Sequence, residues 1–234
     1  MHALIFAAGL GERMRPLTDH TPKPLLPVGG KPLIVWHLEK LAALGVRNVV
    51  INTSWLAGEF PRALGDGSRW GLTLSYSYEG PTALETGGGM LHALGLLGME
   101  PFIALNGDIW TDFDFTHLPA QPAGDAHLVL VDNPAHNPQG DFHLDPRGSV
   151  LSQVAPKLTF AGIGVYRPRL LDRWRECIGD AAGADASPPR FKLAPLLREA
   201  MVRNQVSGVH HSGLWTDVGT PSRLAELDHQ LSQP

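Results

Sequence analysis

A loop rich in glycine and proline near the start of the chain carries the residues best suited to chemistry. It spans residues 9–28, reads GLGERMRPLTDHTPKPLLPV, and follows an apolar run at residues 3–8. Glycines let a backbone approach a phosphate chain closely, and its N–H groups can then bind the phosphate oxygens. Arg13, Arg15 and Lys23 add positive charge to the same loop, and three prolines stiffen it. The loop therefore predicts a polyphosphate site.

This loop differs from the two best-known phosphate-binding motifs. A P-loop requires Gly-x-x-x-x-Gly-Lys followed by Ser or Thr, and that string does not occur in the chain. The dinucleotide fingerprint requires Gly-x-Gly-x-x-Gly, but Met14 stands three residues after Gly11. What remains is Gly-x-Gly-x-Arg-x-Arg-Pro-Leu-Thr, followed by Pro-Lys-Pro-Leu.

Two aspartates far apart in the sequence are candidate metal ligands. Asp108 follows an apolar segment, and Asp217 stands in Trp-Thr-Asp-Val-Gly-Thr, before a glycine turn. A charge at the end of a buried strand needs a partner. Magnesium usually takes one or two carboxylates together with phosphate oxygens and waters. In contrast, His210 and His211 are predicted to be structural, because adjacent strand residues point to opposite faces.

The first half of the chain alternates between predicted strands and predicted helices. The strands are expected at residues 3–8, 48–53, 72–78 and 101–105, and the helices at 32–44, 56–64 and 91–97. Such alternation favours a doubly wound sheet. Ligands of these sheets bind at the carboxyl ends of the strands, where the first loop and Asp108 would both lie.

The second half has more turns. Strands are expected at residues 127–131, 140–144, 159–166, 206–210 and 214–218, and helices at 170–178, 193–201 and 221–231. Between the first two of these helices, residues 179–189 (GDAAGADASPP) are predicted to form a surface loop. We see no internal repeat and no linker, so a single domain is expected.

Composition limits the partners and the compartment. The 234 residues are 43% hydrophobic and 18% charged, which suits a folded α/β domain. The net charge of −4 gives no general field for nucleic acid, so the phosphate ligand is expected to be a small molecule. Cys177 is the only cysteine, which excludes an intrachain disulfide. No signal peptide or membrane span is recognised, and a cytoplasmic location is expected.

The first-loop motif resembles the signature of the sugar-1-phosphate nucleotidyltransferases. These enzymes join a sugar 1-phosphate to a nucleoside triphosphate and release pyrophosphate. The resemblance runs from Met1 to about Leu231, and it implies a Rossmann-like doubly wound mixed sheet of the GT-A-like nucleotidyltransferase type. It also implies one domain, with a nucleotide half at about residues 1–115 and a sugar-binding half at about residues 116–234.

The resemblance implies roles for individual residues. Arg13 would neutralise the β- and γ-phosphates, Lys23 would lie nearer the α-phosphate or the sugar phosphate, and Arg15 would be a third catalytic cation. Mg²⁺ would be held by Asp108 and Asp217. The implied nucleotide-binding residues are Ala8, Gly9, Gly11, Glu12, Arg13, Lys23, Glu85, Gly88 and Asn106. The implied substrate-binding residues are Asn106, Gly140 and Asp141, and Trp215 is added to them because it lies close to Asp217 in the sequence.

Within the family, the motifs look most like the short bacterial N-acetylmuramate-1-phosphate uridylyltransferases, which serve peptidoglycan recycling. They include LETGGG, NGDIWTD, GDF and KLAPLLR. One departure from the wider family is that the Glu-Lys-Pro lysine has no safe equivalent in Lys157, so the cation that faces the sugar phosphate stays open. A mannose-1-phosphate guanylyltransferase, a glucose-1-phosphate uridylyl- or thymidylyltransferase and a non-catalytic nucleotide-sugar sensor are the alternatives. The expected assembly is a monomer or a small homo-oligomer.

Overall fold

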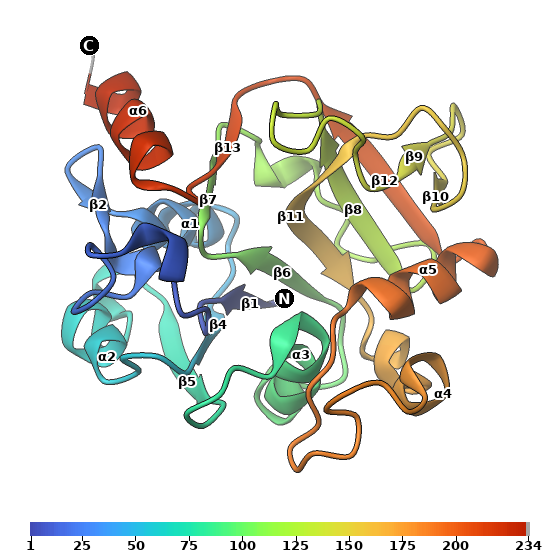
Figure 1. The fold of residues 1–234 in the computed structure, drawn as a ribbon, viewed down its shortest axis with the longest axis horizontal. Coiled ribbons are helices and arrows are strands. Elements are labelled where there is room, and N and C mark those ends of the chain that lie inside the picture. Colours follow the sequence, from blue (N-terminus) through green and yellow to red (C-terminus); the bar gives the residue numbers. More distant parts are fainter. Residues whose placement is uncertain (233–234) are drawn as a thin grey trace.

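A mixed seven-stranded sheet organises the fold in the computed structural model, which describes residues 1–232 (Figure 1). Most neighbouring strands run parallel, and β11 is antiparallel to both of its neighbours. In spatial order the strands are β12 (Val206–His211), β8 (Ala126–Val131), β11 (Thr159–Tyr166), β6 (Phe102–Asn106), β1 (His2–Phe6), β4 (Asn48–Thr53) and β5 (Thr73–Tyr78).

The central strand β1 shows why the sheet is covered on both faces. It pairs in parallel with β4 on one side and β6 on the other. Ala3, Leu4 and Ile5 are each 0% exposed. Because side chains alternate along a strand, Ala3 and Ile5 join one hydrophobic core and Leu4 joins the other. A continuous apolar run therefore becomes a strand buried between two helical layers.

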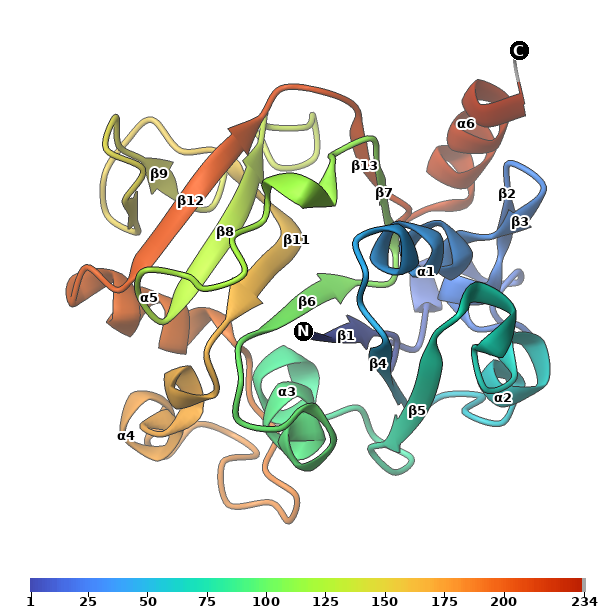
Figure 2. The same ribbon diagram turned by 180° about the vertical axis from the view of Figure 1, so that it is seen from behind.

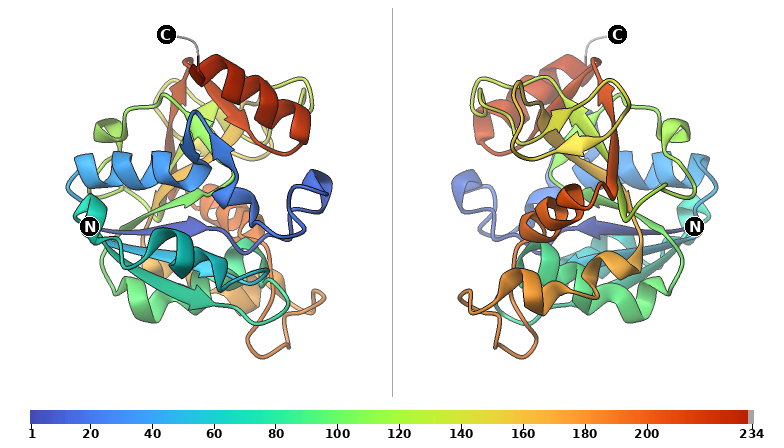
Figure 3. Two further views of the ribbon diagram at one scale, coloured as in Figure 1. Left: turned by 90° about the vertical axis from the view of Figure 1, so that its left-hand side faces the viewer. Right: turned by 90° about the vertical axis from the view of Figure 1, so that its right-hand side faces the viewer.

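Helices form these two layers. On one face α1 and α2 pack into the first core, and on the other face α3 and α5 pack into the second. Opposite views show α1 and α5 on opposite sides of the sheet (Figures 1 and 2), and Figure 3 turns the layers on edge. The helices are α1 (Leu33–Ala43), α2 (Glu59–Leu64), α3 (Glu85–Leu97), α4 (Trp174–Ile178), α5 (Ala194–Val202) and α6 (Pro221–Ser232).

Shorter elements complete the fold around the sheet. The hairpin β2–β3 lies next to α6, where the Gly29 N–H donates to Asp228 Oδ1 at 2.8 Å (Figure 1). The remaining strands are β2 (Pro27–Val28), β3 (Lys31–Pro32), β7 (Ile109–Thr111), β9 (His143–Leu144), β10 (Val150–Leu151) and β13 (Trp215–Asp217). The 3₁₀ turns are Glu12–Met14, Lys23–Leu25, Ser68–Trp70, Phe115–His117 and Pro168–Leu171.

The predicted fold class, a doubly wound mixed α/β sheet, is confirmed. Three elements differ most from expectation. Helix α3 begins at Glu85 rather than at residue 91, because its glycines lie inside the helix. The strand expected at 140–144 is only His143–Leu144, and the helix expected at 170–178 is a 3₁₀ turn followed by α4.

None of the helices in residues 1–232 is both long enough and apolar enough to cross a membrane.

Candidate active site

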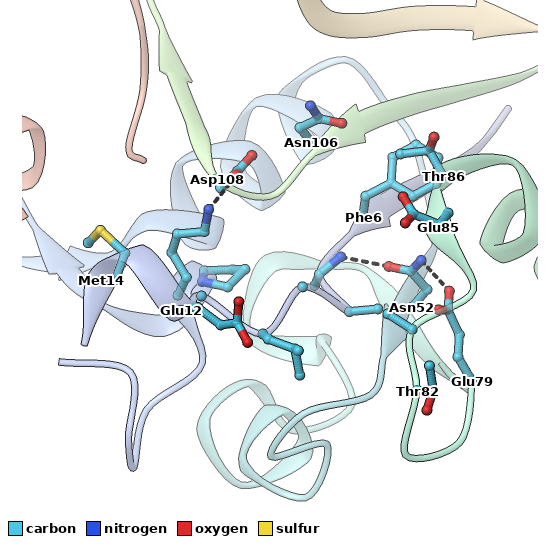
Figure 4. A pocket seen from close by; sticks show the side chains of 18 of the residues that line it. Phe6, Glu12, Met14, Asn52, Glu79, Thr82, Glu85, Thr86, Asn106 and Asp108 are labelled. Carbon is cyan, nitrogen blue, oxygen red and sulfur yellow. Dashed lines mark hydrogen bonds and ion pairs between the residues drawn. The ribbon is translucent and has the colours of Figure 1, made fainter. Parts of the chain in front are cut away.

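A large cavity opens at the carboxyl ends of the parallel strands (Figure 4). Its volume is about 630 Å³, and its walls come mainly from the segments that follow β1, β5 and β6. This is the position at which doubly wound sheets bind ligands. The predicted site residues that line it are Ala8, Gly9, Gly11, Glu12, Arg13, Lys23, Glu85, Asn106 and Asp108.

The first loop is shaped by one obligatory glycine and one buried anchor. Gly11 has a φ of +65°, and a Cβ there would lie 2.8 Å from Cγ2 of Thr18. The Gly11 carbonyl accepts hydrogen bonds from the Met14 N–H and from the Thr18 hydroxyl, both at 2.8 Å. Met14 is fully buried, whereas its neighbour Arg13 is exposed and lines the cavity. Within residues 1–232, no hydrogen bond or ion pair engages the Arg13 guanidinium.

Lys23 and Asp108 form an ion pair that lines the cavity. Lys23 Nζ donates to Asp108 Oδ2 at 2.5 Å, and the side chains are 12% and 34% exposed. Lys23 begins a short 3₁₀ turn and stands between Pro22 and Pro24, which restrict the backbone on both sides of it. The sequence predicted that residues 85 positions apart would meet, and the structure brings these two together.

Asp217 lies beside this pair, one strand away. Strand β13 pairs with β7, and the Val218 N–H donates to the Asp108 carbonyl at 2.7 Å. Asp217 Oδ1 accepts a hydrogen bond from Arg223 and lies 3.0 Å from Nε2 of His136. Asp217 itself does not line the cavity, although Gly219 does. The two predicted metal ligands are therefore neighbours, but only Asp108 opens directly onto the cavity.

A buried histidine holds the strand that follows Asp108. His37, on α1, is 1% exposed, and its Nε2 lies 2.9 Å from the carbonyl oxygen of Ile109. Burial lowers the pKa of His37 from 6.5 to about 4. The neutral ring can satisfy this carbonyl only as an Nε2–H donor. His37 thus ties α1 to β7 without adding charge.

A buried polar chain, which sequence reasoning missed, joins three strand ends. The Ala7 N–H donates to Asn52 Oδ1 at 2.6 Å, and Asn52 Nδ2 donates to Glu79 Oε1 at 2.6 Å (Figure 4). Glu79 Oε2 accepts from the Leu84 N–H at 2.7 Å, and burial raises the pKa of Glu79. Asn52 and Glu79 both line the cavity. The only sequence signal was Asn52, a polar residue directly after the apolar residues 49–51.

Arg190 is a third cation in the cavity, and it was also missed. It comes directly after the predicted surface loop, lines the cavity, and lies 3.4 Å from Glu85 Oε1. The loop itself contains no helix or strand, as expected, but its end packs onto the start of α3. No local pattern distinguishes Arg190 from the many exposed arginines of such loops.

Gly88, which was predicted to bind the nucleotide, lies inside α3 and packs against residues 189–190. Its N–H donates to the Phe191 carbonyl at 3.0 Å, and it does not line the cavity. A Cβ at Gly88 would lie 2.4 Å from the Pro189 carbonyl oxygen. The glycine therefore permits close contact between α3 and residues 189–191. Glu85, earlier in the same motif, does line the cavity.

A second, smaller cavity of about 220 Å³ adjoins the first. The two share Phe6, Thr86 and Asn106, so they meet at a common wall. Two of the predicted substrate-binding residues, Asn106 and Asp141, line this smaller cavity. Asp141 Oδ2 accepts from the Phe160 N–H at 2.9 Å, which holds the carboxylate at its edge.

Three other predicted site residues line neither cavity. Arg15 is 57% exposed and pairs with Asp19 at 3.5 Å. Gly140 has a φ of +63° and packs against the backbone of Lys157, and Trp215 donates its indole N–H to the Ala161 carbonyl at 2.9 Å. Arg15 and Trp215 were placed in the site on proximity in sequence, which did not specify where their side chains point.

The adjacent histidines contact different partners, as predicted. His210 Nε2 lies 2.9 Å from Asp132, and His211 Nε2 lies 2.7 Å from Asp112. No group of three or more His, Cys, Asp or Glu side chains suited to a metal ion occurs in the part of the chain that the structure describes.

Comparison with known proteins gives consistent matches. A family model described as nucleotidyl transferase matches residues 2–142. The chain is 52% identical to an N-acetylmuramate alpha-1-phosphate uridylyltransferase of Neisseria meningitidis serogroup B, over 97% of this chain and 96% of that protein. It is 33% identical to a protein of the same name from Caulobacter vibrioides, over 99% and 97%.

A solved structure has the same fold. It is that of a Bacillus anthracis protein described as a glucose-1-phosphate thymidylyltransferase, and its TM-score to this chain is 0.82. The match covers 100% of this chain and 96% of the other at 21% identity.

Proposed function

The chain belongs to the nucleotidyl transferase family, and we propose that it transfers a uridylyl group from UTP to N-acetylmuramate 1-phosphate. The products are UDP-N-acetylmuramate and pyrophosphate. The observation that carries this proposal is the 52% identity to a uridylyltransferase of that specificity over nearly the full length of both proteins. N-acetylmuramate is a sugar of peptidoglycan, so we place the reaction in peptidoglycan recycling.

The reaction joins two anions. A phosphate oxygen of the sugar 1-phosphate attacks the α-phosphorus of UTP in line, and the bond from that phosphorus to the β-phosphate oxygen breaks. Catalysis then requires positioning and charge stabilisation, with little covalent work for the protein. Arg13, Lys23 and Arg190, which all line the larger cavity, supply that charge. Arg13 and Arg190 can fork onto phosphate oxygens, because a guanidinium presents paired donors.

The two neighbouring aspartates fit a divalent metal, which we propose to be Mg²⁺. Each carboxylate has one oxygen engaged by a cation, Lys23 for Asp108 and Arg223 for Asp217. The other oxygen of each accepts no hydrogen bond from residues 1–232. Two hard oxygen donors beside a phosphate site are what Mg²⁺ commonly takes from a protein. When bound, the ion would neutralise phosphate charge.

The two cavities support separate binding roles for the two halves of one domain. The larger cavity is built almost entirely from residues 1–115, with Arg190 and Gly219 added from the second half. Most residues that line the smaller cavity come from residues 116–234. We therefore assign UTP to the larger cavity and the sugar ring to the smaller one. The phosphate of the sugar would lie at the wall that they share.

A matrix of substrates tests this proposal. Pyrophosphate release is measured with UTP, GTP, CTP and dTTP, each with the 1-phosphates of N-acetylmuramate, N-acetylglucosamine, glucose and mannose. The pair of UTP and N-acetylmuramate 1-phosphate should have the highest kcat/KM, by about tenfold or more. A faster GTP–mannose or dTTP–glucose pair would assign the chain to another specificity. Absence of turnover with every pair would favour a nucleotide-sugar sensor.

A further inference from the structure

The smaller cavity combines apolar walls with a single cation. Its polar lining residues are Thr86, Asn106, Asp141 and Tyr166, and Arg198 is its only basic lining residue. The apolar lining side chains are Phe6, Ala104, Phe142, Phe160, Leu193, Ala194 and Leu197. Such walls suit methyl groups and a sugar ring, and the cation adds a site for one negative charge.

Arg198 has no partner of its own in the described chain, residues 1–232. No hydrogen bond or ion pair engages its guanidinium there. The adjacent Glu199 already binds Arg173 and Arg203. By contrast, two other arginines of this region, Arg169 and Arg203, pair with Asp125 at 2.6 Å and 3.0 Å. Arg198 is exposed, and its charge has no partner within residues 1–232 at the cavity that it lines.

Helix α5 fixes the position from which Arg198 reaches the cavity. Leu196 and Leu197 are 1% and 2% exposed and belong to the second core. Leu197 and Arg198 both line the cavity, and Pro195 stands in the first turn of the helix. The buried leucines therefore hold α5 against the second core, and α5 in turn positions the backbone of Arg198 beside the cavity.

We propose that Arg198 is a specificity-determining residue that binds the carboxylate of the lactyl ether of N-acetylmuramate. This inference rests on the proposed function. The lactyl group is what distinguishes this sugar from N-acetylglucosamine, and it adds one carboxylate and one methyl group. Arg198 suits the carboxylate because a guanidinium pairs with it through two parallel hydrogen bonds. The apolar lining suits the lactyl and acetyl methyl groups.

The charges in the cavity favour one orientation of the sugar. Asp141 also lines this cavity, and its carboxylate would repel the lactyl carboxylate. Asp141 instead suits sugar hydroxyl groups, which can donate hydrogen bonds. The phosphate groups of both substrates have Arg13, Lys23 and Arg190 in the larger cavity, which Arg198 does not line. Arg198 is therefore left for the acidic substituent.

The test compares two sugars in two variants and a control. The kcat/KM values for N-acetylmuramate 1-phosphate and N-acetylglucosamine 1-phosphate are measured at saturating UTP for the wild-type enzyme, R198M and R198K. Lys192→Met is the matched control, because Lys192 is an exposed cation of the preceding segment that lines neither cavity. Circular dichroism and thermal melting of each variant establish that it is folded.

Loss of the charged pair should lower kcat/KM of R198M for the muramate substrate by about 10- to 100-fold. The value for the N-acetylglucosamine substrate should fall by no more than about threefold, so the preference collapses. R198K should retain part of the preference, and K192M should retain all of it. In calorimetry, R198M should bind UDP-N-acetylmuramate more weakly and lose the difference from UDP-N-acetylglucosamine.

Several outcomes overturn the assignment. An unchanged preference in R198M removes Arg198 from recognition, and an equal loss with both sugars makes its role structural. If the wild-type enzyme itself prefers the neutral sugar, the proposed function fails, and the role of Arg198 fails with it. A wild-type preference for the muramate that persists in R198M overturns the Arg198 assignment alone.

Discussion

The two adjoining cavities differ in the way they are built. The larger one is formed by loops at strand ends and contains three cations, Arg13, Lys23 and Arg190, together with Asp108. The smaller one has mostly apolar walls and a single basic residue, Arg198. The charged side chains gather in the larger cavity, where the phosphates would react. The apolar walls surround the smaller cavity, where the sugar would bind. From this difference we expect that substitutions can alter catalysis and the preference among sugars separately.

Variants of the larger cavity should therefore affect every sugar alike, whereas variants of the smaller cavity should change the ratio between sugars. The shared wall of Phe6, Thr86 and Asn106 is where this separation would fail.

The largest expected effect is that of Asp108→Asn. Removing the charge of this proposed metal ligand should lower kcat by about 1,000-fold or more with all sugar 1-phosphates, while the melting temperature changes little. Pyrophosphate release over a Mg²⁺ titration measures this. The control is Glu39→Gln, because Glu39 also pairs with a lysine, Lys31, but lines neither cavity. Unchanged activity of D108N would remove Asp108 from the metal site.

Lys23→Ala should have the next largest effect. Loss of a cation that we propose to stabilise charge in the transition state should lower the rate by about 100-fold or more. The ratio of kcat/KM values for two sugars should stay the same. Lys31→Ala, which breaks the corresponding pair outside the cavities, is the matched control. A decrease in rate of less than about threefold in K23A would show that Lys23 does not take part in catalysis.

The free energy of unfolding of the protein should depend on pH through His37. The folded-state pKa of about 4 lies below the ordinary 6.5, so the unfolded chain binds more protons between these values. The contribution of neutral His37 to the free energy of unfolding is therefore present above pH 6.5. It falls by about 2 kcal/mol as the pH decreases to 5. Urea unfolding of wild type and His37→Gln at several pH values measures this. Parallel curves for the two proteins would exclude His37 as the cause.

A smaller effect is expected at the contact between α3 and residues 189–191. Gly88→Ala places a Cβ 2.4 Å from the Pro189 carbonyl, and it should cost about 1–3 kcal/mol of stability. Gly95→Ala on the same helix is the control, because nothing lies within 4 Å of its Cβ, and it should stabilise by about 0.5–1 kcal/mol. Chemical denaturation measures both. Equal effects of the two substitutions would show that residues 189–191 are free to move away.

Local pattern predicted most of the sheet. The runs at residues 48–53 and 159–166 form strands with the predicted bounds, because continuous apolar or β-branched stretches favour a buried strand. The start of α3 was predicted too late, at residue 91, because glycine disfavours the interior of a helix and the helical pattern is clear only after the glycines. Their helical conformation is supported by contacts with Pro189, Phe191 and Glu79, which are distant in the sequence.

Within the site, the sequence located the residues that belong to one compact motif. Gly11, Arg13 and Lys23 lie in a single loop with its own turn chemistry, and they line the cavity together with Asp108. Asn52, Glu79 and Arg190 were not found, because each is a lone polar residue in a segment with no motif. These residues come together in the cavity only because the fold brings their separate segments together.

By itself the sequence determined a cationic loop after a buried strand and an alternation of strands with helices, since backbone propensity and hydrophobic period are local properties. The tertiary structure was needed to show that Arg190 lines the larger cavity and Arg198 the smaller one. It also decided that Trp215 and Arg15 lie outside both. The direction of such side chains is set by packing between segments far apart in the chain, and no short stretch of sequence encodes it.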